Sequence, residues 1–360
     1  MPCRSVAIPS IACAMLAGVA FLLAEAAAAP LVDRPLVIAH RGASNYLPEH
    51  TMEAYRLAVQ MRADFIEPDL FLTADGVLVA RHDRSLNATT NVQQVAASDP
   101  DLFAKGTQVG GTRQYYIDTL TYADIQKLSA TSRGGAAYSN PATSPHYDGT
   151  ESFAVPTFND VLDYVYDLYT TSGRIVGVYP EAKFAFDEVN FRLDPVFDEY
   201  NFAIADAILA ALSDPKYNGF FDGSRNNVFL QSFIPSIVQY MAAKTDLPVV
   251  FLTSCPATAE AAQAIAQFAA GIGTSTGQAT QECIDRAHAA GLLVHAYTVS
   301  LANAALHDTL YARGVDGIFT NTPDLAVVSR DALYPVPEPA SLALLGLGLM
   351  GLLVARRRLA

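Results

Sequence analysis

Short apolar runs alternate with amphipathic helical patterns from residue 36 to about residue 330. The helical patterns, such as those over 157–169, 203–212 and 258–270, fill most of the gaps between the apolar runs. Strands separated by helices predict βα units and a parallel sheet. The strands number about eight if a short one near 271–274 is included. We therefore expect an α/β fold, a TIM-type (β/α)8 barrel, over residues 30–335.

The length of the chain fits this fold, and its net charge limits the kinds of partner that it can bind. The chain has 360 residues, of which 51% are hydrophobic, and a barrel of this type takes about 250 residues as one unit. The formal net charge is −13, and Lys and Arg cluster only at the extreme C-terminus. A nucleic-acid partner is therefore not expected, because a phosphate backbone needs a basic surface. A small phosphorylated substrate stays compatible with this charge.

The N-terminal segment 1–29 has the pattern of a secretory signal peptide. Arg4 precedes an apolar run from Val6 to Ala24, and small residues suited to cleavage follow through Ala29. We expect the body of the protein to be exported and exclude this segment from the fold.

The C-terminal segment 336–360 also carries a processing pattern. Pro337-Glu338-Pro339 leads into an uncharged run over 342–355, which three arginines close. The run is short for a membrane span, and its basic end would stay cytoplasmic. The segment resembles the PEP-CTERM sorting signal of Gram-negative bacteria. That resemblance implies recognition by an exosortase-type enzyme, transient or tail-mediated membrane contact, and a periplasmic, cell-surface or extracellular location; an ordinary tail anchor is the alternative.

A polar stretch over residues 84–156 interrupts the barrel pattern after the third expected strand. It is rich in Thr, Ser, Gly and Asn and contains one expected helix over 122–128. Long insertions of this kind in compact folds are usually functional or disordered. Two interpretations stay open, a lid over the barrel mouth and a passive surface insertion.

Two cysteines, Cys255 and Cys283, remain outside the signal segment. They have no metal-type spacing, and in an oxidising compartment they could form one disulfide. Two buried free thiols are the other possibility that the sequence leaves open.

Charged and polar residues stand at the ends of four successive expected strands. The carboxyl ends of barrel strands converge on one face, where active sites form. A packed barrel core would place apolar side chains there, so the co-location favours a site over a structural role for each residue. The residues are His40 and Arg41, Glu67 and Asp69, His82 and Asp83, and Glu181 and Lys183.

These residue types suit the cleavage of a phosphodiester. Carboxylate oxygens are the ligands that hard cations such as Ca²⁺ and Mg²⁺ prefer, and a bound cation polarises phosphoryl oxygens. Histidine titrates near neutrality and suits a general base and general acid pair. Arginine and lysine stabilise charge on phosphate. The expected metal ligands are Glu67, Asp69 and Glu181, the acid/base pair is His40 and His82, and the phosphate-binding residues are Arg41 and Lys183.

Several further residues are weaker candidates. Glu49 follows Pro48 at an expected helix start, where it would serve the helix N-terminus; supporting the metal shell or orienting Arg41 are the functional alternatives. His295 lies in the middle of an expected strand, where core packing is the favoured interpretation. No role is assigned to His50, His146, His288 and His307.

The chain resembles the glycerophosphodiester phosphodiesterase family over roughly residues 36–330, in its longer periplasmic or extracellular branch. The resemblance rests on motifs in the same order and spacing, which are His40-Arg41-Gly42-Ala43, Pro48-Glu49-His50-Thr51, Glu67-Pro68-Asp69, Ala74-Asp75-Gly76, Arg81-His82-Asp83, Tyr179-Pro180-Glu181-Ala182-Lys183, Gln231-Ser232-Phe233, Ala296-Tyr297-Thr298-Val299 and Gly317 to Asp324.

The resemblance implies hydrolysis of glycerophosphodiesters to glycerol 3-phosphate and an alcohol through a cyclic phosphate. It implies one divalent cation, with Ca²⁺ expected in preference to Mg²⁺, and the same acid/base, ligand and phosphate residues. His50 replaces the Asn of the short branch and Ala182 a branched residue. The chain has no Trp, so Phe184, Phe233 or Tyr297 must cover the glycerol. Which histidine is the base and which the acid stays open.

Two alternatives belong to other classes. A phospholipase D-like or phosphatidylinositol-cleaving barrel enzyme also uses two histidines, but it would show an exposed apolar rim, whereas residues 84–156 are polar. A non-catalytic surface protein built on a dead barrel would tolerate loss of a catalytic group, and all seven are intact.

Overall fold

The computed structural model describes residues 34–133, 146, 152–185 and 198–335. The expected signal peptide, 1–29, and the expected sorting segment, 336–360, lie outside the described residues. Within the described part, no helix combines the length and apolar character needed to cross a membrane.

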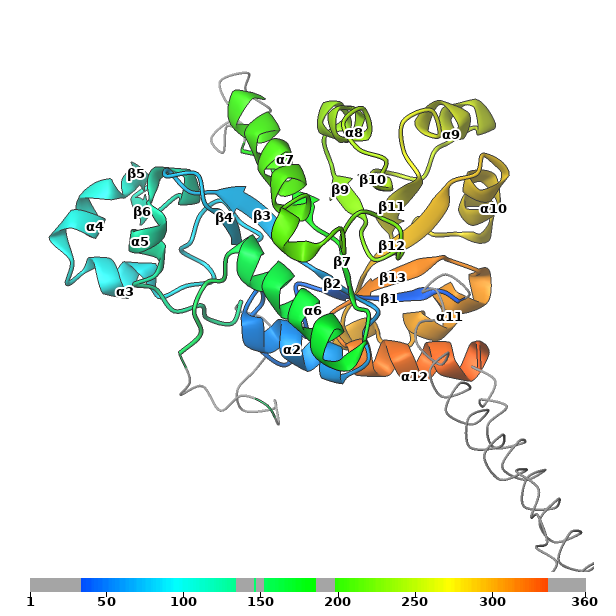
Figure 1. Cartoon of the computed structure of the whole chain (residues 1–360), viewed down its shortest axis with the longest axis horizontal. Coiled ribbons are helices and arrows are strands. Elements are labelled where there is room, and N and C mark those ends of the chain that lie inside the picture. Colours follow the sequence, from blue (N-terminus) through cyan, green and yellow to red (C-terminus); the bar gives the residue numbers. More distant parts are fainter. Residues whose placement is uncertain (1–33, 134–145, 147–151, 186–197, 336–360) are drawn as a thin grey trace, which may run out of the picture.

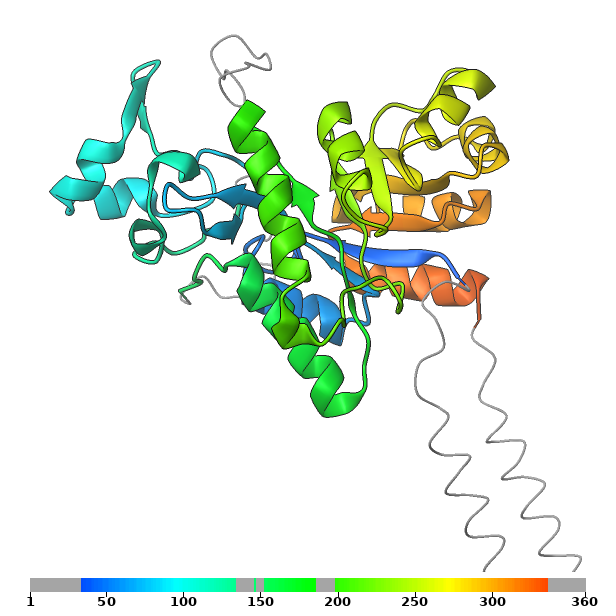
Figure 2. The same cartoon turned by 45° about the horizontal axis from the view of Figure 1, so that its top comes forward.

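A curled sheet of parallel strands forms the centre of the molecule, with helices around it (Figures 1 and 2). The strand β2 continues into β3 across Pro68, and β7 continues into β8 across Pro180. Since β2 pairs with β7 and β3 with β8, the ends of the strand order meet and the sheet closes. The strands are β1 (Leu36–His40), β2 (Phe65–Glu67), β3 (Asp69–Leu72), β7 (Gly177–Val178), β8 (Glu181–Ala182), β9 (Leu230–Ser232), β10 (Val249–Leu252), β11 (Gly271–Ser275), β12 (Leu293–Val299) and β13 (Gly317–Thr320).

Counted with β2/β3 and β7/β8 each as one strand, the closed sheet has eight parallel positions, which confirms the expected (β/α)8 barrel. The surrounding helices are α2 (Met52–Gln60), α6 (Phe158–Ser172), α7 (Asp198–Leu212), α8 (Pro235–Ala242), α9 (Ala259–Ile265), α10 (Gln281–Ala289), α11 (Leu306–Arg313) and α12 (Pro323–Leu333).

The apolar run 77–80 is not a barrel strand, and its expected place as the third strand was wrong. It forms β4 (Leu78–Ala80), which pairs antiparallel with β3. A tight turn reverses the chain, because Gly76 has a positive φ of 80° and its amide donates to the carbonyl of Thr73. The third barrel position belongs to β7/β8, so residues 84–156 follow the second barrel strand and its hairpin.

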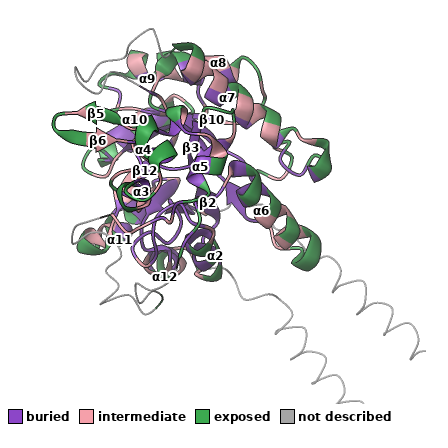
Figure 3. Ribbon diagram, turned by 90° about the vertical axis from the view of Figure 1, so that its left-hand side faces the viewer, coloured by how far each residue is buried: buried purple, intermediate pink, exposed green. Residues whose placement is uncertain are grey.

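The segment after this hairpin is more ordered than the sequence suggested. It projects to one side of the barrel (Figure 1) and holds short elements with exposed faces (Figure 3). The helix expected over 122–128 is shorter, and a capping box at Thr121 and Asp124 begins it. The elements are α3 (Val92–Ala96), α4 (Pro100–Lys105), β5 (Thr107–Val109), β6 (Thr112–Gln114), a 3₁₀ turn (Ile117–Thr119) and α5 (Tyr122–Ile125).

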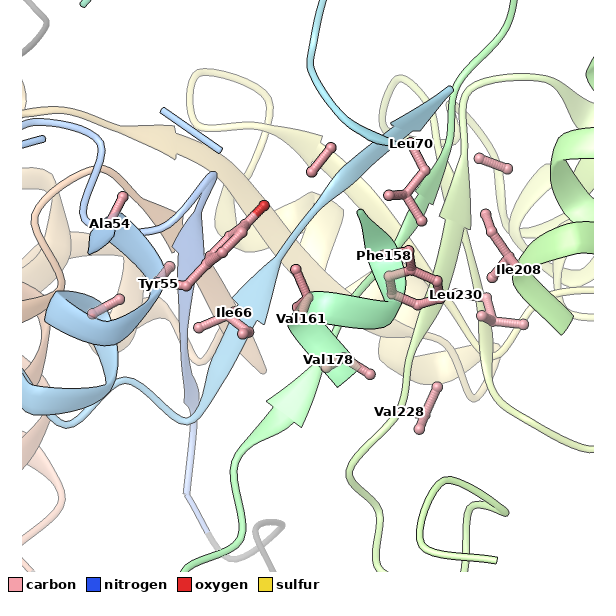
Figure 4. Close-up of a cluster of buried hydrophobic side chains, with 14 of the residues drawn as sticks. Ala54, Tyr55, Ile66, Leu70, Phe158, Val161, Val178, Ile208, Val228 and Leu230 are labelled. Carbon is pink, nitrogen blue, oxygen red and sulfur yellow. The ribbon is translucent and has the colours of Figure 1, made fainter. Parts of the chain in front are cut away.

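Two hydrophobic clusters lie on the two faces of the barrel sheet. The larger one joins the outward faces of the strands to α2, α6 and α7, as Figure 4 shows for Ile66, Phe158 and Ile208. The smaller one fills the barrel interior with Leu36, Ile38, Phe65, Tyr179, Phe229, Val250 and Phe319. His295 is fully buried beside this interior cluster and bonds to the Tyr179 hydroxyl at 2.8 Å, so the core interpretation of His295 is confirmed.

Cys255 and Cys283 form a disulfide that ties the segment after β10 to α10. The structure therefore decides between the two possibilities that the sequence left open.

Candidate active site

A cavity of about 180 Å³ opens at the carboxyl ends of the barrel strands. Side chains alternate along a strand, so a residue two positions after an interior core residue also faces inward, one layer higher. This rule places His40 above Ile38, Glu67 above Phe65, Glu181 above Tyr179 and Gln231 above Phe229. The cavity is lined by His40, Arg41, Glu67, Asp69, His82, Glu181, Gln231, Phe233, Leu252, Tyr297, Thr298 and Phe319.

Three carboxylates form the floor of this cavity. Glu67, Asp69 and Glu181 are all buried, and each offers an oxygen within 4.8 Å of the others. The parallel pairing of β3 with β8 sets Asp69 directly beside Glu181. Among the described residues they are the cluster that meets the geometry of a metal site.

The three carboxylates repel one another, and a bound cation would relieve this repulsion. Burial and the neighbouring Asp69 and Glu181 raise the pKa of Glu67 well above its usual value. Burial, opposed by Lys183, and the neighbouring Asp69 raise the pKa of Glu181 to about 8. Three ionised carboxylates this close would repel one another strongly at low dielectric. A buried acidic cluster of oxygen donors therefore fits a divalent metal ion.

Two basic residues lie against the carboxylates. The Lys183 Nζ is 3.0 Å from Glu181 Oε1 and 3.7 Å from Asp69 Oδ1. The backbone amide of Arg41 donates to Glu67 Oε2 at 2.9 Å. The side-chain Nε of Arg41 lies 3.4 Å from Asp69 Oδ2. The guanidinium of Arg41 also bonds to Glu49 at 3.2 Å, the contact that an orienting role for Glu49 requires.

His40 ends β1 and reaches the cavity beside the carboxylates. Its Nδ1 lies 2.7 Å from the side-chain oxygen of Asn321, at the end of β13. Because that oxygen is an acceptor, Nδ1 carries the proton and Nε2 is the nitrogen left for the cavity. Burial and the adjacent Arg41 lower the pKa of His40 well below its usual value, so the ring is neutral.

His82 follows β4 and reaches the cavity only because the hairpin turns back. The amide of Arg81 donates to the Asp69 carbonyl at 2.9 Å, which returns the chain to the level of the carboxylates. The His82 Nδ1 lies 2.6 Å from Asp83 Oδ1. Burial and Lys183 lower the pKa of His82, whereas the bond to Asp83 raises it. A carboxylate partner thus distinguishes His82 from His40.

Two aromatic rings stand at the wall of the cavity. Phe233 and Tyr297 contact each other edge to face, with ring centroids 5.8 Å apart. Phe233 is partly exposed, with 38% of its surface accessible, so it lies at the rim.

Sequence reasoning missed the residues that support the site from behind. His50 is fully buried, and its Nε2 lies 2.8 Å from Asp69 Oδ2. The Gln231 Nε2 donates to Glu67 Oε1 at 3.1 Å, and Asn321 orients His40. The placement of His50 beside Glu49 in the Pro-Glu-His-Thr motif was the available signal, but its partner Asp69 lies 19 residues further along the chain.

An α/β barrel with two imidazoles and three buried carboxylates at the carboxyl ends of its strands is the architecture of a barrel hydrolase, and its acidic cluster fits a divalent metal ion. The model of the Glycerophosphoryl diester phosphodiesterase family matches residues 40–325, and the chain belongs to this family. The PEP-CTERM protein-sorting motif matches residues 335–358.

Curated relatives agree with the family assignment. The chain is 34% identical to a glycerophosphodiester phosphodiesterase of Bacillus subtilis, over 81% of this chain and 85% of that protein. It is 28% identical to one of Arabidopsis thaliana, over 85% of this chain and 88% of that protein. The chain is therefore an enzyme of this phosphoric diester hydrolase class, and the dead-barrel alternative is wrong.

Solved structures share the fold. A glycerophosphoryl diester phosphodiesterase from Silicibacter pomeroyi matches with a TM-score of 0.64 and 22% identity, over 84% of this chain and 95% of that one. A phosphodiesterase from Oleispira antarctica, solved with its product sn-glycerol-3-phosphate, matches with a TM-score of 0.59 and 19% identity, over 83% of this chain and 97% of that one.

Proposed function

We propose that this enzyme hydrolyses glycerophosphodiesters with His40 as general base and His82 as general acid, beside one divalent cation. The observation that carries the proposal is the convergence of two imidazoles and three buried carboxylates on one cavity. The products are glycerol 3-phosphate and an alcohol.

Glu67, Asp69 and Glu181 would hold the cation. An all-carboxylate donor set favours a hard ion, and we propose Ca²⁺ in preference to Mg²⁺ because the three ligands are protein side chains, whereas Mg²⁺ usually keeps several waters. When bound, the ion supplies Lewis-acid polarisation of the phosphoryl oxygens. Burial raises the pKa of Asp69, but Lys183 and His50 outweigh it and lower the pKa well below its usual value. Asp69 is therefore ionised before the cation binds.

The hydrogen-bond partners of the two histidines support their order. His40 pairs with a neutral amide, so its neutral Nε2 can take the proton of the glycerol 2-hydroxyl. His82 pairs with a carboxylate, which stabilises the imidazolium, so its Nε2 can give a proton to the leaving alcohol. The 2-hydroxyl oxygen bonds to phosphorus as the bond to the alcohol oxygen breaks. Water then opens the cyclic phosphate with the two proton transfers reversed.

The basic and aromatic residues would position the substrate. Arg41 and Lys183 would bind phosphate oxygens, and Glu49 would keep the Arg41 guanidinium in place. Phe233 and Tyr297 would cover the glycerol carbons at the cavity wall.

Export completes the proposal. The sorting motif indicates export and cell-surface sorting in a Gram-negative bacterium, and the Cys255–Cys283 disulfide fits an oxidising compartment. We propose that a signal peptide over 1–29 is removed and that an exosortase-type enzyme recognises 336–360. Expression in a host with and without an exosortase, followed by mass analysis of the surface protein, tests both cleavages.

One assay tests the activity and the order of the histidines. Release of glycerol 3-phosphate is measured from glycerophosphocholine, with and without chelator, for wild type, His40→Ala and His82→Ala. His288→Ala is the control, because His288 also pairs with a carboxylate, Asp316 at 2.8 Å, on the outside of the barrel. A parallel arm offers intact phospholipid vesicles, which a phospholipase would cleave.

A second substrate separates base from acid. The p-nitrophenyl ester of glycerol 3-phosphate has a leaving group that departs without protonation. His82→Ala should lose about 10²- to 10⁴-fold in kcat with glycerophosphocholine and far less with this ester, whereas His40→Ala should lose equally with both. Activity that survives chelation or both substitutions would overturn the mechanism, and the opposite substrate pattern would reverse the order.

A further inference from the structure

The segment that follows the hairpin sends one arginine into the site. Arg133 binds Glu49 with two bonds, from Nε to Oε2 at 3.0 Å and from Nη2 to Oε1 at 2.7 Å. Its third nitrogen, Nη1, lies 2.6 Å from Asp83 Oδ2. One guanidinium thus joins two carboxylates from two different loops of the barrel mouth.

Each of these carboxylates contacts a residue of the proposed machinery. Glu49 also binds Arg41, and Asp83 uses its other oxygen, Oδ1, for His82 Nδ1 at 2.6 Å. The contacts form a ladder in which Arg41, Glu49, Arg133 and Asp83 alternate in charge and which ends at the His82 ring. We call these five residues the charge ladder.

The Arg133–Glu49 pair of the charge ladder is more buried than a surface ion pair, whereas the Asp83 and His82 side chains are 29% and 34% exposed. The Glu49 side chain is 2% exposed and the Arg133 side chain 20%. Exposed ion pairs contribute little, but a desolvated two-bond pair between arginine and a carboxylate fixes geometry. Arg133, the bridging member, lies between α5 and α6, outside the strands and helices of the barrel.

The backbone around Arg133 is itself anchored. The amide of Thr131 donates to the Thr89 carbonyl at 2.9 Å, and the amide of Ala130 donates to the Phe153 carbonyl at 2.7 Å. The fully buried Arg81 bonds to the carbonyls of Thr89 and Glu49, which ties this support to the loop after β1. The backbone just before Arg133 is therefore held in place, which limits where its guanidinium can lie.

We propose that Arg133 is a positioning residue that pins the Asp83 carboxylate and thereby holds the His82 ring with Nδ1 protonated and Nε2 facing the cavity. An aspartate bound through only one oxygen can rotate, and the His82 ring would rotate with it. With Oδ2 held by Arg133, Oδ1 stays in line with Nδ1. This inference rests on the proposed acid role of His82 and gives the segment over 84–156 a part in catalysis.

The test compares Arg133→Gln and Arg133→Lys with Arg113→Gln. Arg113 belongs to the same segment and bonds to the Gly106 carbonyl at 2.6 Å. Arg133→Gln should lower kcat for glycerophosphocholine about 10- to 100-fold, the usual loss for a partner that orients a functional group. KM should change much less. Arg133→Lys should recover part of the loss, because lysine keeps the positive charge but cannot form the two parallel bonds of a guanidinium. The kcat of Arg113→Gln should match that of wild type.

Two readouts distinguish positioning from general damage. With the p-nitrophenyl ester, the Arg133→Gln loss should nearly vanish, because that leaving group needs no acid. In an Asp83→Asn background, Arg133→Gln should cause no further loss, because its route to His82 is already broken and Glu49 keeps its own bonds to Arg41. Thermal unfolding of each variant checks that the fold is intact.

The outcomes separate this inference from the proposed function. Wild-type kcat in Arg133→Gln, an equal loss with both leaving groups, or an additive loss in Asp83→Asn would overturn the positioning role. If His82→Ala itself keeps full activity with glycerophosphocholine, the proposed function fails, whatever Arg133 does.

Discussion

The buried imidazole of His50 holds Asp69 by a 2.8 Å hydrogen bond from Nε2 to Oδ2. The Tyr55 hydroxyl lies 2.7 Å from the other ring nitrogen, Nδ1. Burial lowers the pKa of His50 to about 4, although Asp69 opposes the shift, so the ring is neutral and donates one proton. His50 therefore orients a proposed metal ligand without adding charge.

Removing this imidazole should weaken cation binding. His50→Ala should lower the affinity for Ca²⁺ about 10- to 100-fold, and His50→Asn should lower it less, because an amide can still donate. Calorimetric titration of the metal-free protein measures the affinity directly. His288→Ala removes a comparable histidine from an exposed pair and should leave the affinity unchanged. Equal affinities for wild type and His50→Ala would exclude this orienting role.

The metal-free protein should become less stable as the pH rises from about 5 to about 8. Glu181 has a pKa of about 8 in the folded protein. An unfolded glutamate titrates near 4.3, so the folded state binds more protons between these values and loses stability as it releases them. Saturating Ca²⁺ should abolish this fall, because the ion stabilises the ionised carboxylates.

Thermal unfolding across this pH range, with and without Ca²⁺, measures the effect. Glu181→Gln is the matched variant, since it keeps the shape of the side chain and removes the charge. Its metal-free melting temperature should fall less with pH than that of wild type. Parallel curves for the two proteins would show that Glu181 does not carry the effect.

Loss of the disulfide should destabilise the fold without altering the chemistry. Cys255 and Cys283 are 28 residues apart, and closing a loop of this size contributes about 3.5 kcal/mol by restricting the unfolded chain. The double substitution Cys255→Ser/Cys283→Ser should lower the free energy of unfolding in urea by about this amount. Reductant should destabilise wild type but not the double variant, and kcat should be the same for both.

Tyr179 and His295 should matter for stability and not for catalysis. Among the described residues, His295 Nε2 has no hydrogen-bond partner. The bond from Nδ1 to the Tyr179 hydroxyl is therefore the hydrogen bond that satisfies this buried ring. Tyr179→Phe keeps the stacking on Phe229 but leaves a buried polar group unpaired, which costs about 1–3 kcal/mol. Urea unfolding measures the loss. A fall in kcat without loss of stability would contradict a purely structural role.

The local pattern of the sequence predicted most of the barrel and the chemistry of its site. The apolar runs predicted strands, and the polar residues at their ends predicted that His40, Glu67, Asp69 and Glu181 would meet. This worked because side-chain alternation along a strand depends on local geometry, and closing a barrel brings all strand ends to one face.

The direction of β4 could not be predicted in the same way. Its residues have the apolar character of a barrel strand, but a tight turn at Gly76 pairs it antiparallel with β3. Periodicity reports which side chains share a face and not which neighbour the backbone joins. His82 was expected at a barrel strand end, and it reaches the cavity through a hairpin instead.

The sequence by itself therefore determined the parallel barrel and the residue types of a phosphodiester-cleaving site. The tertiary structure decided the contacts between distant segments, such as His50 with Asp69, Cys255 with Cys283, and Arg133 with Glu49, 84 positions away. The physical reason is that hydrogen bonds and ion pairs act over a few ångströms in space. The distance between two residues along the chain does not predict such contacts, which form only when the barrel closes and the hairpin turns back.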